Sequence, residues 1–484
     1  MKIIDNKLAY HEIDFLLPAQ RFNINFSYIT QKGLPFVREF VLRLVHLAPM
    51  SASQVAAFFG FSRCEVQEAI EDLVDRNELT LTTDGRLTLT EKANGYFSEL
   101  GEVPRLSLLR DSTAHLSFDL ATFSCLGKEN FSGKWKAGIP IKVDDENASR
   151  SEALVEKNFQ RQFQKILQDG LLSKSLMEDE SDPPSIYTVT SVNKIKQVPL
   201  RLPVQFNIAE DGTNIEREDF ELLESSDYVH QQISLEVDRL TRPINLGDVK
   251  RAMLEIGDGE TSKIFSLNGD RINLQFLEDL WRLESNSRKG RSTFLGPIYS
   301  SDNWGLVQMH LAPVIKARRE SKADVGQTPF KWVAPSDPFW GKSSSLQVRF
   351  AEILDKACTK EKRLYSPAIY LPVQGLEDLR SARQWKREFD PNAEAAYGLA
   401  EGFLGGNVEV LYFEGEFVVV VYHVSLPDAY PVSLPIGFLS TEKEIIRSVG
   451  GVLSKYLDGS SGFDRPNDCG LLTRFGRSGD QDRH

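Results

Sequence analysis

The stretch Ser53–Ser62, SQVAAFFGFS, runs directly into RCEVQEAIEDLVDRN over Arg63–Asn77. Apolar residues in both halves recur at the three- and four-residue spacing that is typical of helices. Gly60 lies between the halves and can adopt the positive φ that a tight turn requires. Ser53 and Ser62 are each predicted to cap a helix by accepting a bond from a free backbone N–H. The stretch therefore predicts two short helices joined by a turn.

The segments on either side extend this pattern to a small domain. Gly33–Leu47 predicts a preceding helix, and the alternating residues on both sides of Asp84-Gly85 predict a two-stranded hairpin. The order helix, helix, turn, helix and hairpin resembles the winged helix-turn-helix superfamily over residues 33–92. This resemblance implies a three-helix domain in which Thr80–Thr90 forms the wing.

The resemblance also implies where DNA would be contacted. In that family the second helix of the pair enters the major groove, and the wing lies beside the duplex. The positions of this chain that match this surface, and that we predict to bind DNA, are Ser62, Arg63, Gln67, Arg86 and Lys92.

Charge argues against a strong DNA contact. Ser62–Asn77 contains two cations and five anions, a net charge of 2 − 5 = −3. Because phosphate neutralisation supplies much of the affinity for DNA, an acidic helix is poorly suited to that role. Winged helices also dock onto proteins. The sequence therefore predicts DNA binding that is weak and salt-sensitive, and it leaves protein docking and a purely structural role open.

The composition is that of an ordinary globular chain. Its 484 residues carry a net charge of −12, with 41% hydrophobic and 26% charged residues. The four cysteines are far apart in the sequence, so neither a zinc ribbon nor a disulfide framework is predicted. The opening residues Met1–Asp5 do not resemble a signal peptide, and no apolar run is long enough to cross a membrane. We expect a cytoplasmic location, with no metal, no cofactor and no membrane contact.

Periodicity predicts an α+β multidomain chain. An N-terminal winged helix-turn-helix is followed by a middle mixed α/β region and a C-terminal α/β domain. Asp111-Ser112 predicts a turn, and Ala393–Leu404 predicts a small-residue helix. The predicted divisions are 1–100 for an arm and the winged helix, 101–180 for strands and a long amphipathic helix, 186–326 for the mixed domain, 327–460 for the C-terminal domain and 461–484 for a flexible tail.

Two short basic runs stand out in this acidic chain. Positive side chains near a turn suit anions, so both runs are candidate phosphate contacts, although such runs are commonly only solvated. The candidate residues are Arg288, Lys289 and Arg291 in the first run, and Lys316, Arg318 and Arg319 in the second.

The search for catalytic motifs is mostly negative. The sequence contains no nucleotide-binding, zinc-protease or serine-hydrolase motif. Helix, strand, helix and a final strand pair near the C-terminus resemble the layout of a phospholipase D-like half-domain. That family's lysine is absent two residues after His423, so the resemblance implies a degenerate site. No catalytic residue is predicted: His423 and Asp428 are the pair to test as a base and its orienting carboxylate, and a strand-end histidine that caps a turn is the favoured interpretation.

These observations favour a non-catalytic subunit that acts through partner proteins. A winged helix attached to α/β modules is typical of DNA-associated or adaptor subunits in bacterial multi-protein complexes, including antiviral defence assemblies. An effector-responsive transcription regulator is the alternative, and an enzyme with a degenerate or unrecognised phospholipase D-like site is a third interpretation. The sequence leaves the oligomeric state open.

Overall fold

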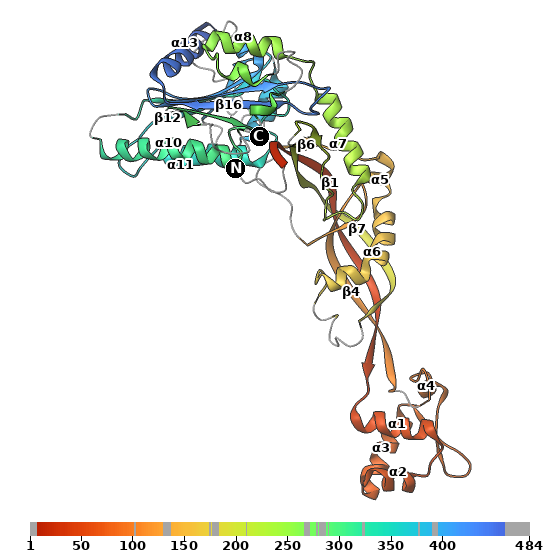
Figure 1. Ribbon diagram of the computed structural model, residues 1–484. Helices are drawn as coiled ribbons and strands as arrows, with labels where there is room; N and C mark the ends of the chain where they lie inside the picture. The colour runs from red at the N-terminus through yellow and green to blue at the C-terminus, as the bar shows by residue number, and fades with distance from the viewer. Residues whose placement is uncertain are drawn as a thin grey trace, which may run out of the picture. The chain divides into compact units, whose positions relative to one another are not determined.

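The computed structural model describes residues 7–100, 103–128, 137–173, 176, 183–209, 211–265, 272–276, 279, 287–288, 290–321, 325–375, 378–389 and 395–459. These residues form a mixed α+β, multidomain fold with three sheets, as the sequence predicts (Figure 1). The chain divides into two compact units, each assembled from separate segments. The larger unit comprises Met1–Pro18, Phe131–Val143 and Pro199–His484, and the smaller unit comprises Ala19–Asn130 and Asp144–Val198. This division follows packing rather than chain order, so the linear boundaries given above stay predictions.

Two long antiparallel strands form the frame of the smaller unit. β1 (Lys7–Gly33) pairs with β4 (Arg105–Asp119) from Ala19 opposite Asp119 to Gly33 opposite Arg105. The predicted turn at Asp111-Ser112 is wrong, because both residues are paired within this ladder. The Ser27 hydroxyl donates to the Asp111 carboxylate at 2.6 Å, which fixes the strand where a turn was expected.

One helix packs on this frame. Aromatic rings of α6 (Ser151–Gln168), Phe159 and Phe163, lie 5.1 and 5.7 Å from the ring of Phe26 in β1. This contact buries the apolar stripe that the sequence of α6 displays. The remaining elements here are α5 (Asp145–Ser149), β5 (Cys125–Gly127) and the first part of β7 (Ser185–Ala209).

A small helical module, residues 34–97 and called the N-terminal module below, belongs to the smaller unit. Its first three helices and its hairpin follow the predicted order, a short fourth helix follows the hairpin, and a shared apolar core joins these elements. Assignment of this module to the winged helix superfamily stays a proposal. Its elements are α1 (Phe36–Leu47), α2 (Ala52–Phe59), α3 (Arg63–Asp75), β2 (Leu79–Leu81), β3 (Leu87–Leu89) and α4 (Glu91–Asn94).

The turn between α2 and α3 follows the predicted chemistry, with one correction. Gly60 has a φ of 71°, and Ser62 caps α3 by accepting a bond from the backbone N–H of Glu65 at 3.3 Å. The predicted cap at Ser53 is wrong, since Ser51 caps α2 and Ser53 lies inside the helix. Gln54 selects Ser51, because its side chain reaches back to the Ser51 backbone N–H at 2.9 Å and completes a capping box.

An eight-stranded sheet forms the centre of the larger unit, with the order β13-β12-β11-β14-β15-β16-β10-β9. β11, β12 and β13 run parallel to one another, and the other pairings are antiparallel. β15 (Phe417–Val424) is buried along its whole length, which explains its continuous apolar sequence. The other strands are β9 (Ser287–Arg288), β10 (Arg291–Leu295), β11 (Pro329–Val333), β12 (Ser366–Val373), β13 (Ala396–Ala400), β14 (Val408–Phe413) and β16 (Leu434–Ser440).

Helices cover both faces of this sheet (Figure 1). α10 (Ser301–Glu320) and α11 (Ser344–Lys356) lie on one face, and α8 (Leu246–Ile256) and α13 (Lys443–Gly459) lie on the other. The unit also contains α7 (Asp227–Leu240), α12 (Leu379–Glu388) and the short strands β6 (Ile139–Pro140) and β8 (Asn214–Ile215).

The predicted helix over Ala393–Leu404 is wrong. Ala396–Ala400 forms β13, which pairs in parallel with Ile369–Val373 of β12. Alanine and leucine favour a helix locally, but hydrogen bonding to a buried neighbouring strand decides the conformation here. The predicted tail at 461–484 lies outside the described residues. No helix in the described ranges combines the length and the apolar character needed to cross a membrane.

Candidate functional site

Arg63 and Arg86 are the predicted DNA-binding residues whose side chains have no partner among the described residues. Arg63 is the first residue of α3, and Arg86 directly follows the hairpin turn at Gly85, whose φ is 71°. Both side chains are exposed, and within the described residues neither has a hydrogen-bond or ionic partner. Both cations are therefore available to a ligand at the surface of the N-terminal module.

The other three predicted residues already have partners inside the module. The Ser62 hydroxyl donates to the Glu65 carboxylate at 2.7 Å as part of the capping box. The Gln67 amide donates to the Glu71 carboxylate at 3.0 Å, and the Lys92 ammonium donates to a backbone carbonyl at 2.7 Å. These bonds are exposed, so a ligand would have to compete with them.

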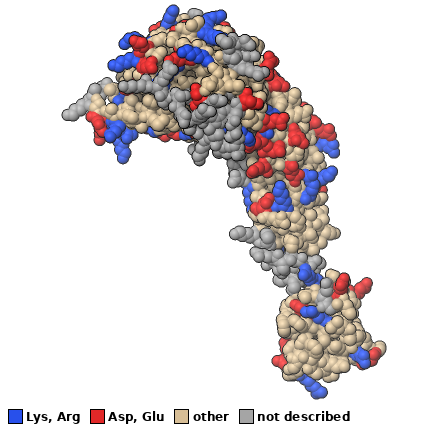
Figure 2. Space-filling model, viewed as in Figure 1, with Lys and Arg blue, Asp and Glu red and all other residues tan. Residues whose placement is uncertain are grey.

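The exposed surface of α3 is acidic. Asp72 is paired with Arg76 at 2.8 Å, but that single cation offsets only one carboxylate. On the face of the module that is visible in Figure 2, charged residues lie at the margins of a largely uncharged surface. The exposed carboxylates of α3 are Glu65, Glu68, Glu71, Asp72 and Asp75.

Three phenylalanines, called the aromatic ladder below, lead up to the start of α3. The Phe58 and Phe59 rings are 5.1 Å apart, and the Phe59 and Phe61 rings stack at 5.3 Å. Phe58 is 67% exposed, and the other two are half-buried. Phe59 and Phe61 also pack against the core of the module, so Phe58 is the exposed member of the ladder, and exposed aromatic side chains are enriched at protein interfaces.

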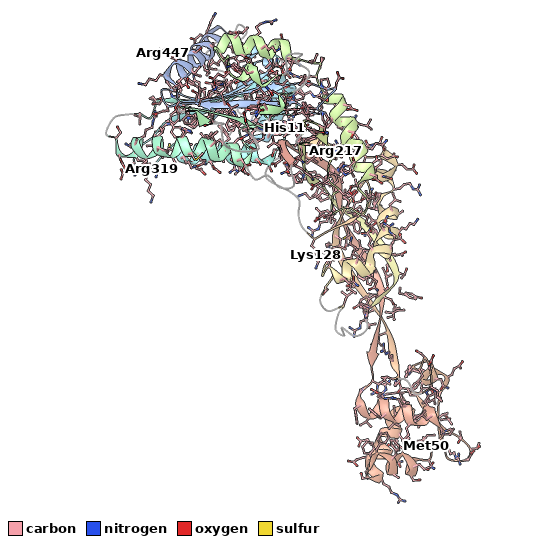
Figure 3. All side chains as sticks on the ribbon, viewed as in Figure 1. His11, Met50, Lys128, Arg217, Arg319 and Arg447 are labelled. Atoms are coloured by element: carbon pink, nitrogen blue, oxygen red, sulfur yellow. The ribbon has the colours of Figure 1, made fainter. Side chains whose placement is uncertain are left out.

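The candidate phosphate contacts occupy different environments. Arg291 is buried, with its guanidinium 2.6 Å from Asp258 and over the ring of Phe438. Arg318 is also buried and pairs with Glu416 at 2.8 Å. Both arginines are better explained as structural cations than as phosphate contacts. Lys316 and Arg319 are exposed on α10, and Figure 3 labels Arg319. Lys289 and the side chain of Arg288 lie outside the described residues.

His423 lies at the end of β15 in a buried polar group called the His423 cluster, which also contains Asp337, Glu409, Trp332 and Ser433. The imidazole Nδ1 is 3.0 Å from Asp337 Oδ2, and Nε2 is 3.3 Å from Glu409 Oε2. The Trp332 indole donates to Glu409 at 2.8 Å, and the Ser433 hydroxyl donates to Asp337. Both ring nitrogens of His423 are thus hydrogen-bonded, and each of the two carboxylates has at least two hydrogen-bond partners.

The predicted pairing of His423 with Asp428 is wrong. Asp428 is exposed and lines an open pocket of about 830 Å³, whereas His423 points to the two buried carboxylates instead. The pocket is lined by the carboxylates of Glu216, Asp219, Asp227, Asp238 and Asp428 together with Arg217, His230 and Arg242. In the part of the chain that is described, no three or more histidine, cysteine or carboxylate side chains are arranged so that they could hold a metal ion.

The environment of His423 fixes its charge. Burial by itself would lower the pKa of His423, but the hydrogen bonds to Asp337 and Glu409 outweigh burial and raise that pKa to about 9. Burial would likewise raise the pKa of Asp337, and its hydrogen bond with His423 lowers it. His423 is therefore an imidazolium at neutral pH with both N–H groups in use. Such a ring has no lone pair with which to act as a base or nucleophile.

A second histidine lies close to this group. His11 of β1 is buried, and burial lowers its pKa to about 4, so it is neutral at pH 7. Its charged form would be opposed by the cation on His423 and favoured by Asp337. A neutral His11 avoids placing two like charges together in the core.

Sequence reasoning missed Asp337, Glu409 and His11. The predicted hairpin of β14 and β15 could have pointed to Glu409. In this hairpin Glu409 lies opposite Val421, which is two residues from His423 and therefore on the same face of the sheet. Asp337 and His11 lie 86 and several hundred positions away along the chain, and no spacing rule connects them to His423.

Comparisons with known proteins yield little for this chain. No protein-family model matches it, and no curated protein matches it. Among solved structures it is similar to TrmBL2, described as an archaeal chromatin protein with a novel mode of DNA binding, at 9% sequence identity. That alignment covers 50% of this chain and 72% of TrmBL2, with a TM-score of 0.21, so the likeness carries no argument about fold or function.

Proposed function

We propose that this chain is a non-catalytic adaptor whose N-terminal module docks onto a partner protein. The observation that carries this proposal is the exposed Phe58 of the aromatic ladder in a module whose helix α3 has an acidic surface. Phe58 at the end of α2 is 67% exposed, and the next helix, α3, carries five exposed carboxylates, which suits a protein segment bearing apolar and basic side chains. Duplex DNA, with its uniform negative charge, is a poorer match to that surface.

The larger unit supports the non-catalytic part of the proposal. His423, the histidine of the candidate catalytic pair, is 1% exposed and holds two carboxylates through both ring nitrogens. A catalytic histidine needs access to substrate and a nitrogen that can exchange a proton. The His423 cluster provides neither in this conformation.

DNA contact is the second candidate, and the exposed positions of Arg63 and Arg86 favour it. Arg63 lies in the first turn of α3, and Arg86 lies beside the hairpin turn of the same module. Exposed arginines of this kind are the residues that contact DNA phosphates. With few cations in the module, such binding would be weak and would fall steeply as salt rises.

One set of variants separates the two candidates. The chain is co-expressed with the products of genes beside its own, and capture is compared for wild type, Phe58→Glu and Arg63→Ala/Arg86→Ala. DNA binding of the same proteins is followed by the anisotropy of a labelled duplex at low and physiological salt. The adaptor proposal expects one protein to be lost with Phe58→Glu and retained with the double arginine variant.

The contrary result is equally clear. If duplex binding persists at physiological salt and disappears in Arg63→Ala/Arg86→Ala, while Phe58→Glu changes neither DNA nor protein binding, DNA contact replaces protein docking as the function of the module. Leu81→Glu is the matched control, because Leu81 is 60% exposed on the hairpin and lies outside the aromatic ladder.

A further inference from the structure

Helix α1 has a second apolar face that the described part of the chain leaves uncovered. Its core-facing side is buried within the N-terminal module. Along the other side, Phe36, Phe40, Arg43 and Leu47 follow one another at intervals of four, three and four residues, so they form one stripe, called the α1 stripe below. Phe36 is 69% exposed and Leu47 is 55% exposed. Exposed large apolar groups at both ends of one helix face indicate an interface.

Contacts along the α1 stripe make it continuous. The rings of Phe36 and Phe40 are 4.5 Å apart, and the Arg43 guanidinium lies over the Phe40 ring at 5.5 Å. Arg43 also approaches the Glu39 carboxylate at 3.4 Å. The side chains thus already lie side by side along the helix, which lowers the entropy lost when a second surface packs on them.

We propose that the α1 stripe packs against the same stripe of a second copy of this chain, as an antiparallel pair of helices. Spacing of four and three residues is that of the seam between two packed helices. The stripe is also symmetric about its midpoint: Phe36 would face Leu47 of the second copy, and Phe40 would face Arg43. A two-fold interface requires this reciprocity, because each surface must fit itself.

Charge complementarity favours a second copy over other occupants. Within one chain Arg43 lies over the Phe40 ring and approaches the Glu39 carboxylate. The antiparallel pair would bring the same two groups of the second copy to Arg43, so its cation would face a further aromatic ring and a further opposite charge. No two like charges face each other across the stripe. Nucleic acid is a poor occupant, since Arg43 is the sole cation among the four stripe residues.

The size of the surface sets the expected strength. α1 has 12 residues and is therefore only about 18 Å long. One face of such a helix is small beside the roughly 1,600 Å² of a standard stable interface. The dimer is accordingly weak and concentration-dependent. This inference is independent of whether the module docks protein or DNA, because the α1 stripe shares no residue with the aromatic ladder or with the predicted DNA-binding residues.

Sedimentation velocity of the nuclease-treated full chain tests the proposal across the micromolar range. Wild type should shift from monomer to dimer as concentration rises. Phe36→Glu and Leu47→Glu should each raise the dimer dissociation constant at least about tenfold, because each replaces an apolar contact of the seam with a carboxylate that loses its water when the helices pack. Phe58→Glu is the matched control and should leave dimerisation unchanged. All three positions are exposed, and circular dichroism checks that each variant is folded.

Cross-linking tests the antiparallel orientation. In a background with the native cysteines replaced by serine, chains carrying Phe36→Cys and chains carrying Leu47→Cys are mixed and oxidised. The proposal expects the mixed Phe36–Leu47 cross-link to predominate over links between like positions. A chain that stays monomeric at every concentration overturns the proposal. It is also overturned by a dimer that Phe36→Glu and Leu47→Glu leave intact, or by predominant links between like positions.

Discussion

Removing the His423 imidazole should destabilise the larger unit more than almost any other single change in it. His423→Leu leaves the carboxylates of Asp337 and Glu409 buried without the cation that joins them. Breaking a buried ion pair from one side typically costs about 3–5 kcal/mol. An independent figure comes from the rise of the His423 pKa from 6.5 to about 9, which corresponds to roughly 3 kcal/mol at 1.36 kcal/mol per pKa unit. We therefore expect a loss of about 3–4 kcal/mol at pH 7.

Urea unfolding followed by tryptophan fluorescence measures this loss directly. Trp332 donates to Glu409, so one of the fluorophores lies within the His423 cluster itself. His310→Leu is the matched control: His310 is half-buried on α10 and has no ion pair among the described residues, so its replacement should change the unfolding free energy little.

A second substitution isolates the charge. Glu409→Gln keeps an acceptor for the Trp332 indole but removes one of the two negative charges. In the His423→Leu background it should restore part of the lost stability, whereas in wild type it should cost stability. The reasoning is refuted if His423→Leu costs less than about 1 kcal/mol, which is within the effect of an ordinary point mutation. It is also refuted if Glu409→Gln has the same effect in both backgrounds.

Three further predictions concern pH, a helix cap and a helix packing contact. The pKa of His423 is raised to about 9 in the folded state, so its contribution to the free energy of unfolding should be complete below pH 6.5 and fade as the pH rises towards 9. The pKa of His11 is lowered to about 4, so its contribution should be complete above pH 6.5 and fade as the pH falls towards 4. Urea unfolding across pH 4–9 should thus peak near pH 6.5 for these two groups, and a steady rise to pH 9 would contradict it. Ser62→Ala should cost the N-terminal module about 1 kcal/mol and speed hydrogen exchange in α3, while Ser53→Ala should not. On α13, Gly450→Ala should lower the stability of the larger unit by about 1–3 kcal/mol in thermal melts, because the new Cβ would lie 2.5 Å from the Tyr412 hydroxyl. Gly451→Ala is the control: its Cβ would have no atom within 4 Å, so it should be neutral or stabilising.

Local chemistry made the N-terminal module predictable. A serine with its glutamate three residues on, and a glycine that takes a positive φ, decide the α2–α3 turn without help from the rest of the chain. Ser51 forms the same capping box with Gln54, three residues later, and recognising this pair in the sequence would have placed the cap at Ser51 and not at Ser53. The helix periodicity of α3 likewise needs only its own residues.

The His423 cluster was not predictable in this way. Strand order in the sheet brings Asp337, Glu409 and His423 together, and strand order depends on pairings between distant segments. Asp428 is exposed but lies only five residues after His423 in the sequence. That proximity made Asp428 the candidate partner of His423, because the carboxylates of Asp337 and Glu409 come close to His423 only in the folded chain. The helix predicted over Ala393–Leu404 was wrong for the same reason, because pairing with β12, and not composition, makes Ala396–Ala400 extended.

The first half of β1 has a consequence for how the larger unit is made. Tyr10 packs against Tyr430 with ring centroids 5.7 Å apart, and the Asp14 carboxylate accepts from the backbone N–H of Ser344, 330 residues later. At about 5–20 residues per second, the ribosome needs roughly 20–60 s to deliver that second partner. For this interval β1 can already pair with β6 and β7, but it lacks its contacts with Tyr430 and Ser344. The larger unit therefore completes its core only near the end of translation.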